Sequence, residues 1–328
     1  MTQPDILKPL KTWSHLAARR RKPSEYEIVS TNLHYTTDNP DAPFELDPNF
    51  EMAQWFKRYR NASPLKHPDW NAFRDPDEIV YRTYNMQQDG QETYVLGLLD
   101  QFSERGHDAM LERPWAGTLA RLYTPARFLF HALQMGSAYL TQIAPASTIS
   151  NCAAYQTADS LRWLTHTAYR TRELSQTFGE TGFGENERQI WELDPAWQGF
   201  RKLVEHALTA WDWGESFVAL SLIVRPAVEE TVLRALGTAA RQHGDTLLGL
   251  LIDAQLIDAQ RHRRWATELV RMALEEEGNR DVLRAWVAKW APLGQAAIED
   301  WCAALPDAGQ AAADAIAATE SFRRSIGL

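Results

Sequence analysis

Long stretches of helical periodicity, separated by short breaks, are the feature that most limits how this chain can fold. Beyond Pro76, apolar residues recur every three or four positions, which is the spacing of one helix face. The breaks carry prolines, glycines or capping residues, which begin and end helices. No segment shows the alternation of apolar and polar residues that is typical of strands. We expect helices from Asp75-Pro76 through Phe102, from Thr124-Pro125 to Pro145, from Ser150 to Gly179, from Asp194-Pro195 to Trp211, and over 215–242, 245–276, 280–304 and 308–325, with a kink at Pro226.

The lengths of these segments predict an all-α fold, a large helical bundle. A helix of nearly 30 residues is roughly 45 Å long, and short turns force such helices to pack antiparallel. Residues 128–158 contain no Asp, Glu, Lys or Arg, which is also a property of membrane spans. However, His131, Gln134 and Asn151 would find no hydrogen-bond partners in lipid. We therefore expect a buried helix pair and no membrane span.

The first 76 residues differ from the rest of the chain in composition. They hold nine of the 16 prolines, together with many aromatic residues. Proline disfavours regular helix, whereas aromatic content argues against simple disorder. We predict an N-terminal arm over 1–76, a bundle over 77–305 and a C-terminal tail helix over 306–328. The aromatic residues that could anchor the arm, either to a partner or to its own bundle, are Trp13, Tyr26, Tyr35, Trp55 and Tyr59.

Charge and cysteine content exclude several classes of protein. Lys and Arg number 34 against 43 Asp and Glu, a net charge of −9, which disfavours a general nucleic-acid binder. Cys152 and Cys302 are too few for a disulfide framework or a thiolate metal site, so we expect buried, inert thiols. The first 20 residues lack the apolar core of a signal peptide. These features predict a soluble cytoplasmic protein.

Motifs for catalysis are absent, and one metal motif occurs in part. A di-metal site in a helical bundle needs Glu-x-x-His on two helices and a further Glu on each of two others. The chain contains one such word, Glu104-Arg105-Gly106-His107, which we expect to be a solvated pair. A different word, Asp-x-x-Arg followed by an aromatic residue, occurs at 159–163 and again at 258–262. Its recurrence indicates a duplicated two-helix unit.

The sequence resembles the hydroxylase β subunits of bacterial multicomponent monooxygenases, most closely the toluene/o-xylene monooxygenase group. The resemblance covers about 11–305, and it implies a ferritin-like bundle similar to that of the iron-binding α subunit. The segments that carry it are KTWSHLAARRRKPSEYEIVS (11–30), YRNASPLKHPDW (59–70), DPDEIVYRTYNMQQDGQETYV (75–95), APASTISN (144–151), QTADSLRWLTHTAYRTREL (156–174), DWGESFVALSL (212–222) and LLIDAQLIDAQRHRRW (250–265).

Compared with the iron-binding pattern of the α subunit, this chain lacks most of the ligands. The resemblance implies that Ser160 and Ala259 replace two Glu ligands and that Trp163 replaces a His, while His262 remains. The two further Glu ligands would fall among 133–139 and 220–224, which contain no acid. The resemblance therefore implies no metal and no catalytic residue in this chain.

The charged residues of the two repeated words remain: Asp159, Arg162, Asp258 and Arg261. Because Leu161, Leu164, Leu256 and Ile257 flank them, we expect the four to form a buried, charge-paired network. The alternative is that each of the four faces solvent.

The resemblance implies a non-catalytic structural subunit. It would pair with a di-iron α subunit and a γ subunit in an (αβγ)₂ assembly that inserts oxygen into an aromatic ring, served by a Rieske-type ferredoxin, an NADH reductase and an effector protein. The β subunit of a phenol hydroxylase is a close alternative. Less favoured are a di-iron enzyme that acts alone through Glu104, His107 and His262, and an unrelated helical adaptor.

Overall fold

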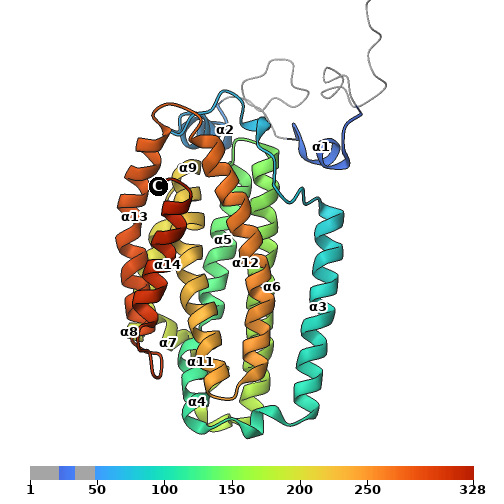
Figure 1. Cartoon of the computed structure of the whole chain (residues 1–328), viewed down its shortest axis with the longest axis vertical. Helices are drawn as coiled ribbons and strands as arrows, with labels where there is room; N and C mark the ends of the chain where they lie inside the picture. The colour runs from blue at the N-terminus through green and yellow to red at the C-terminus, as the bar shows by residue number, and fades with distance from the viewer. Residues whose placement is uncertain (1–21, 34–48) are drawn as a thin grey trace, which may run out of the picture.

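A computed structural model describes residues 22–33 and 49–328, and every regular element in these ranges is helical (Figure 1). The principal α-helices are α1 (Glu25–Ser30), α2 (Glu51–Phe56), α3 (Tyr81–Glu104), α4 (Arg113–Thr118), α5 (Ala126–Ile143), α6 (Ser147–Thr177), α7 (Glu187–Leu193), α8 (Pro195–Ala207), α12 (Thr246–Ala273), α13 (Asn279–Cys302) and α14 (Ala311–Ser325). Between α8 and α12 lies one longer helical run, described below.

Helices α5 and α6 form an antiparallel hairpin in the middle of the bundle (Figure 1). Pro145 separates them, because proline cannot continue a helix and restricts the residue before it. Leu129, Leu140 and Ile149 are fully buried, as the charge-free composition of this region predicts. None of the helices in the described residues has the length and apolar character needed to span a membrane.

The segment from 213 to 242 is a single helical run with two π-helical stretches. It comprises α9 (Trp213–Phe217), η7 (Val218–Val224), α10 (Arg225–Val228), η8 (Glu229–Ala235) and α11 (Leu236–Gln242). Pro226 lies between η7 and η8, so the helix passes through the proline with a change of register and does not end there. Extended π-helix was not expected from the sequence.

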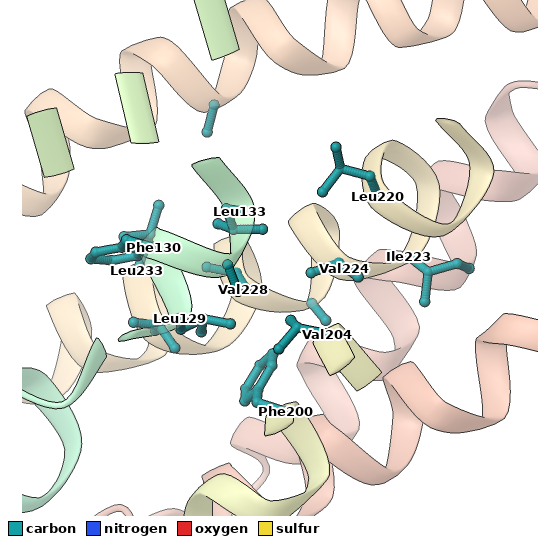
Figure 2. Close-up of a cluster of buried hydrophobic side chains, with 14 of the residues drawn as sticks. Leu129, Phe130, Leu133, Phe200, Val204, Leu220, Ile223, Val224, Val228 and Leu233 are labelled. Carbon is teal, nitrogen blue, oxygen red and sulfur yellow. The ribbon is translucent and has the colours of Figure 1, made fainter. Parts of the chain in front are cut away.

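The hydrophobic core lies where this run meets α5 and α8. Figure 2 shows side chains from these three elements pointing toward one another. They include Leu129, Phe130 and Leu133 of α5, Phe200 and Val204 of α8, and Leu220 and Val224 of η7, whereas Ile223 of η7 faces Gly294 of α13.

Helix α3 lies at the edge of the bundle, at the right of Figure 1. Near its C-terminal end, Val95, Leu98 and Leu99 form a small apolar cluster of their own with α12 residues. Its N-terminal half makes polar contacts instead, which are described in the next subsection.

Three predicted helix boundaries are wrong for local reasons. The Asp75 carboxylate accepts hydrogen bonds from the backbone N–H groups of Asp77 and Ile79, so it stabilises a turn, and α3 begins later, at Tyr81. Helix α6 begins at Ser147, and the hydroxyl of Ser150 donates to the Thr141 carbonyl instead of capping. Helix α8 ends at Ala207, before Trp211.

Candidate functional site

A cluster of buried polar side chains lies between α3, α6, α10 and α12. We call it the polar centre; its members are Tyr84, Gln88, Asp159, Arg162, Arg225, Asp258, Arg261 and His262. All are buried except Arg162, whose side chain is 17% exposed. Buried charges are costly unless they are paired and hydrogen-bonded, so the partners of each group decide what this cluster can do.

Asp159 of α6 is fully buried and accepts from four side chains. The Tyr84 hydroxyl donates to Oδ1 at 2.8 Å, and Gln88 Nε2 lies 3.2 Å from the same oxygen. On the other oxygen, Oδ2, His262 Nε2 lies at 2.7 Å and Arg261 forms an ion pair. Both carboxylate oxygens therefore have two partners each, from α3 and α12.

Asp258 of α12 mirrors this arrangement. Its Oδ1 accepts from Gln88 Nε2 at 3.0 Å and from Arg261 at 3.2 Å. Its Oδ2 accepts from the Trp163 indole N–H at 3.1 Å and from Arg162 at 3.3 Å. The Gln88 amide thus donates to both carboxylates and holds α3 against the two helices that carry them.

The network reaches the surface through Arg162. Its Nε donates to Glu92 at 2.6 Å, and Glu92 also binds His166 at 3.0 Å. Partial burial raises the pKa of the Glu92 carboxyl, but His166 and Arg162 outweigh it and hold that pKa below its usual value. The structure thus brings Asp159, Arg162, Asp258 and Arg261 together and pairs each with an opposite charge.

Arg225 lies at the inner end of the cluster, and our sequence reasoning missed it. Its Nη2 donates to Ser137 at 2.7 Å and to Ser160 at 2.9 Å, and its Nη1 lies 3.3 Å from His262 Nδ1. One signal was available: Arg225 is the sole charged residue between Glu215 and Glu229, within an otherwise apolar run.

These contacts fix the protonation state of His262. Arginine only donates hydrogen bonds, so Nδ1 of His262 accepts and the proton is on Nε2, which donates to Asp159. Burial and the nearby Arg225 and Arg261 hold the pKa of His262 well below its usual value, so the ring is neutral. Burial lowers the pKa of Arg225 to about 10, which leaves it charged at neutral pH.

The residues at the implied ligand positions serve this network. The Ser160 hydroxyl donates to the Gln156 carbonyl at 2.8 Å and accepts from Arg225. Trp163 donates to Asp258, and Ala259 is buried beside a cavity of ≈ 10 Å³ that His262 and Arg225 also line. Within the residues that the structure describes, no group of three or more His, Cys, Asp or Glu side chains could hold a metal ion.

Glu104 and His107 do not form the expected solvated pair. Glu104 is exposed, whereas His107 is buried with its Nε2 at 3.1 Å from Asp245, near the N-terminus of α12. His262 lies 17 residues further along α12, about 25 Å at 1.5 Å per residue. These side chains therefore do not meet in a single site.

Two flanking residues differ from expectation. Leu161 and Ile257 are 51% and 55% exposed, so they do not line the interior as predicted. Each is adjacent in sequence to inward-facing members of the repeated words, and neighbouring positions on a helix point about 100° apart.

Both thiols are buried, and burial raises the pKa of Cys302 to about 11 and that of Cys152 well above its usual value.

The predicted arm anchors fall into three groups. Trp13 and Tyr35 lie outside the described residues. Tyr26 is 5% exposed and accepts a hydrogen bond from the Asp75 N–H, so it packs within its own chain, which was the alternative considered for it. Trp55 and Tyr59 are partly buried, with ring centroids 4.5 Å apart, and the Trp55 indole donates to Tyr139 at 3.0 Å.

Comparison with known proteins gives one family. The family model described as methane/phenol/alkene hydroxylase matches residues 55–277. The β subunit of the hydroxylase component of the toluene-4-monooxygenase system from Ectopseudomonas mendocina is 59% identical over 298 residues, 91% of this chain and 91% of the relative. An oxygenase component of phenol 2-monooxygenase from Pseudomonas sp. (strain CF600) is 24% identical over 283 residues, 84% of this chain and 80% of that protein.

Solved structures agree with these sequence matches. One chain of toluene 4-monooxygenase, solved with toluene bound in the resting active site, superposes with a TM-score of 0.87 at 58% identity, covering 91% of this chain and 98% of that one. A chain of xenon-pressurized phenol hydroxylase from Pseudomonas sp. OX1 has a TM-score of 0.84 at 19% identity, covering 99% and 98%. The expected all-α, ferritin-like fold is confirmed.

Proposed function

Because this chain belongs to the methane/phenol/alkene hydroxylase family, we propose that it is the non-catalytic β subunit of the hydroxylase component of a toluene-type aromatic monooxygenase. The observation that carries the proposal is the 59% identity to a toluene-4-monooxygenase β subunit across 91% of both chains. The phenol-type alternative has less support, because the phenol relative shares 24% identity.

The geometry of the polar centre supports a structural role for this chain. The polar centre is filled by ion pairs, by the Trp163 indole, which donates to Asp258, and by the Arg225 guanidinium, which donates to Ser137. A catalytic metal needs several oxygen or nitrogen ligands with an open position for substrate. At the positions that the resemblance aligns with iron ligands, one imidazole is present, and both of its nitrogens are hydrogen-bonded.

The di-iron centre would therefore belong to a partner α subunit, and with a γ subunit these chains would form an (αβγ)₂ hydroxylase. A Rieske-type ferredoxin, an NADH reductase and an effector protein would serve it in the cytoplasm, where NADH is available. This chain's contribution would be the interface that assembles the hydroxylase.

Exposed apolar side chains support such an interface. Several lie on α3, α6 and α12, whereas monomeric proteins keep their exposed apolar patches small. They are Tyr81, Met86, Tyr94, Leu96, Leu161, Tyr169 and Ile257. We propose that the arm over 1–76 extends the contact, with Trp13, Tyr35, Trp55 and Tyr59 as anchors.

Iron analysis of co-expressed hydroxylase tests the assignment of roles. The chain is co-expressed with the α and γ subunits, and iron is measured per assembled complex. Substitution of the iron ligands of α is expected to remove the iron, whereas His262→Ala in this chain is expected to leave it unchanged. Loss of iron in the His262→Ala complex, or about two irons per copy of this chain purified without α, would overturn the proposal.

A second experiment tests the arm. Deletion of residues 1–40 is expected to reduce the amount of α that co-purifies with this chain. An internal control is the unfolding midpoint of the truncated chain, which should match that of the full chain if the deletion affects association alone. An unchanged yield of complex would reject a role for the arm in assembly.

A further inference from the structure

The Arg225 side chain holds together four helical elements from the inside of the bundle. It extends from α10, and its donors reach Ser137 on α5, Ser160 on α6 and His262 on α12. We propose that the core of this bundle is a cation site whose resident occupant is the Arg225 guanidinium, and that the site binds a free guanidinium-type cation when this side chain is shortened to alanine.

Four acceptors surround Arg225, and one of them, the Gln156 carbonyl at 3.4 Å from Nη2, has no proton to donate. The other three each have their own proton committed elsewhere. The Ser137 hydroxyl donates to the Leu133 carbonyl at 2.8 Å, and the Ser160 hydroxyl donates to the Gln156 carbonyl at 2.8 Å. His262 carries its proton on Nε2, which donates to Asp159. Only lone pairs therefore face the guanidinium, and the lining is organised for a group that donates and does not accept.

The carboxylates of the surrounding network, Asp159 and Asp258, also favour a cation at this position, against the cost of burying it. Three carboxylates, Asp159, Asp258 and Glu92, are bonded into the network, and two further guanidinium groups, Arg162 and Arg261, pair with them. Arg225 supplies the third positive charge. Its influence on Asp159 passes through His262, which lies between the two groups and bonds to both.

The surroundings allow a small planar ion to remain in place. Arg225 is 7% exposed, and the ≈ 10 Å³ cavity beside it is lined by apolar residues together with Ser221, Glu229, His262 and Arg263. Among the described residues, the buried Arg225 Nε and Ser221 hydroxyl have no hydrogen-bond partner. Shortening the side chain would extend this cavity toward the serines and the imidazole, where a guanidinium ion fits the same acceptors. The inference depends on contacts within this chain and not on the proposed function.

The test is chemical rescue of the Arg225→Ala variant of the purified full chain. We expect its unfolding temperature to fall by about 5–10 °C, and millimolar methylguanidinium to recover part of that loss by binding the folded state. Urea at the same concentration, a neutral molecule of similar shape, should give no recovery. The matched control is Arg241→Ala, because Arg241 is 46% exposed and pairs with the exposed Asp253, and this variant should not respond.

No recovery with methylguanidinium, equal recovery with urea, or equal recovery of the Arg241→Ala control would overturn the proposal. If Arg225→Ala does not fold, Arg225→Lys and Arg225→Met replace it. Lysine keeps the charge and methionine keeps the volume, so we expect the lysine variant to be the more stable. A methionine variant as stable as the lysine variant would contradict the cation site.

Discussion

Asp159 shows how strongly one side chain can depend on its neighbours. It is a fully buried carboxylate that accepts hydrogen bonds from four side chains of α3 and α12, with Arg162 of its own helix 3.6 Å away. A buried charge that loses its partner costs far more than a surface pair contributes, because no water replaces the lost bonds. The stability of the centre therefore depends on keeping both members of each pair.

Asp159→Asn tests this dependence. An amide offers one acceptor oxygen and places an NH₂ donor against the donors of Arg261 or His262. We expect a loss of about 3 kcal/mol in the free energy of unfolding, measured by urea denaturation of the full chain. Asp253→Asn is the matched control: Asp253 is 52% exposed and pairs with Arg241, so its loss should be below about 1 kcal/mol. Equal losses in the two variants would contradict this account.

At the residue scale, the sequence could indicate part of the polar centre. The repeated Asp-x-x-Arg words point to Asp159, Arg162, Asp258 and Arg261, and these side chains do lie together. Gln88 and Arg225 could not be found this way, because their partners are far away in sequence. Arg225 contacts Ser137, 88 positions earlier, and periodicity carries no information about such pairings.

At the scale of elements, α12 begins at a buried acid that several groups share. The Asp245 carboxylate caps the helix by accepting from the Leu248 N–H, and it also accepts from the Trp115 indole N–H at 3.0 Å. Burial raises the pKa of this carboxyl, but the bonds from His107, Trp115 and Leu248 outweigh it and hold the pKa below its usual value. The ionised form is therefore favoured in the folded protein.

This predicts a loss of stability in acid. A carboxyl whose folded pKa lies below its unfolded value contributes stability above the unfolded pKa, about 3.9, and loses that contribution as pH falls through the folded pKa. Asp245→Asn keeps an effective cap but cannot ionise. We expect the variant to be less stable at pH 7 and to lose less between pH 5 and pH 3 than the parent protein, measured by urea midpoints. Parallel pH profiles would argue against a role for Asp245 ionisation.

The crossing of α8 and α13 is set by a glycine. A Cβ on Gly199 would lie 2.6 Å from Ala297 Cα and 3.0 Å from the Ala296 carbonyl oxygen, both backbone atoms that cannot move aside easily. Gly199→Ala should therefore destabilise the protein by about 1–3 kcal/mol. Gly97 of α3 is the matched control, since a Cβ there meets nothing within 4 Å. Gly97→Ala should raise the free energy of unfolding by about 0.5–1 kcal/mol. Calorimetry of both variants measures the two effects, and equal effects would contradict the role of Gly199.

The ends of the helices were more predictable than their hydrogen-bonding pattern or the contacts between them. Pro145, Asp194-Pro195 and Gly244-Asp245 mark real boundaries because their effect is local: a missing N–H, or a carboxylate at the first turn. The π-helical stretches η7 and η8 were not predictable, since one extra residue per turn leaves no distinct apolar pattern. The close approach at Gly199 was equally hidden, because it depends on which helices meet.

At the scale of the whole molecule, treatment with a chelator tests whether this chain holds a metal ion. If the interior of this chain holds no metal, a chelator has no folded-state ligand to withdraw, and the unfolding temperature of the separately purified chain should change by less than about 1 °C. The complete hydroxylase complex is the positive control, since we expect it to lose iron. A chelator-induced fall in the isolated chain would show that it holds a structural metal.

The overall architecture followed from the sequence because long amphipathic helices and short breaks leave few arrangements other than a bundle. The assignment to a family did not follow from periodicity; it came from the resemblance and from the comparisons. The exposed Leu161 and Ile257 show the limit of the pattern, since an apolar residue inside a helix can face either the core or a partner surface.

The hairpin of α5 and α6 has a consequence for how the protein is made, because its residues 128–158 contain no Asp, Glu, Lys or Arg. It leaves the ribosome before α8, η7 and α12, the segments that later cover it, because all of these follow it in the chain. At ordinary translation rates this interval is on the order of ten seconds. During that time this uncharged apolar stretch lacks the later helices that bury it, so we expect newly made chains to depend on chaperones and truncated chains that end before α12 to precipitate.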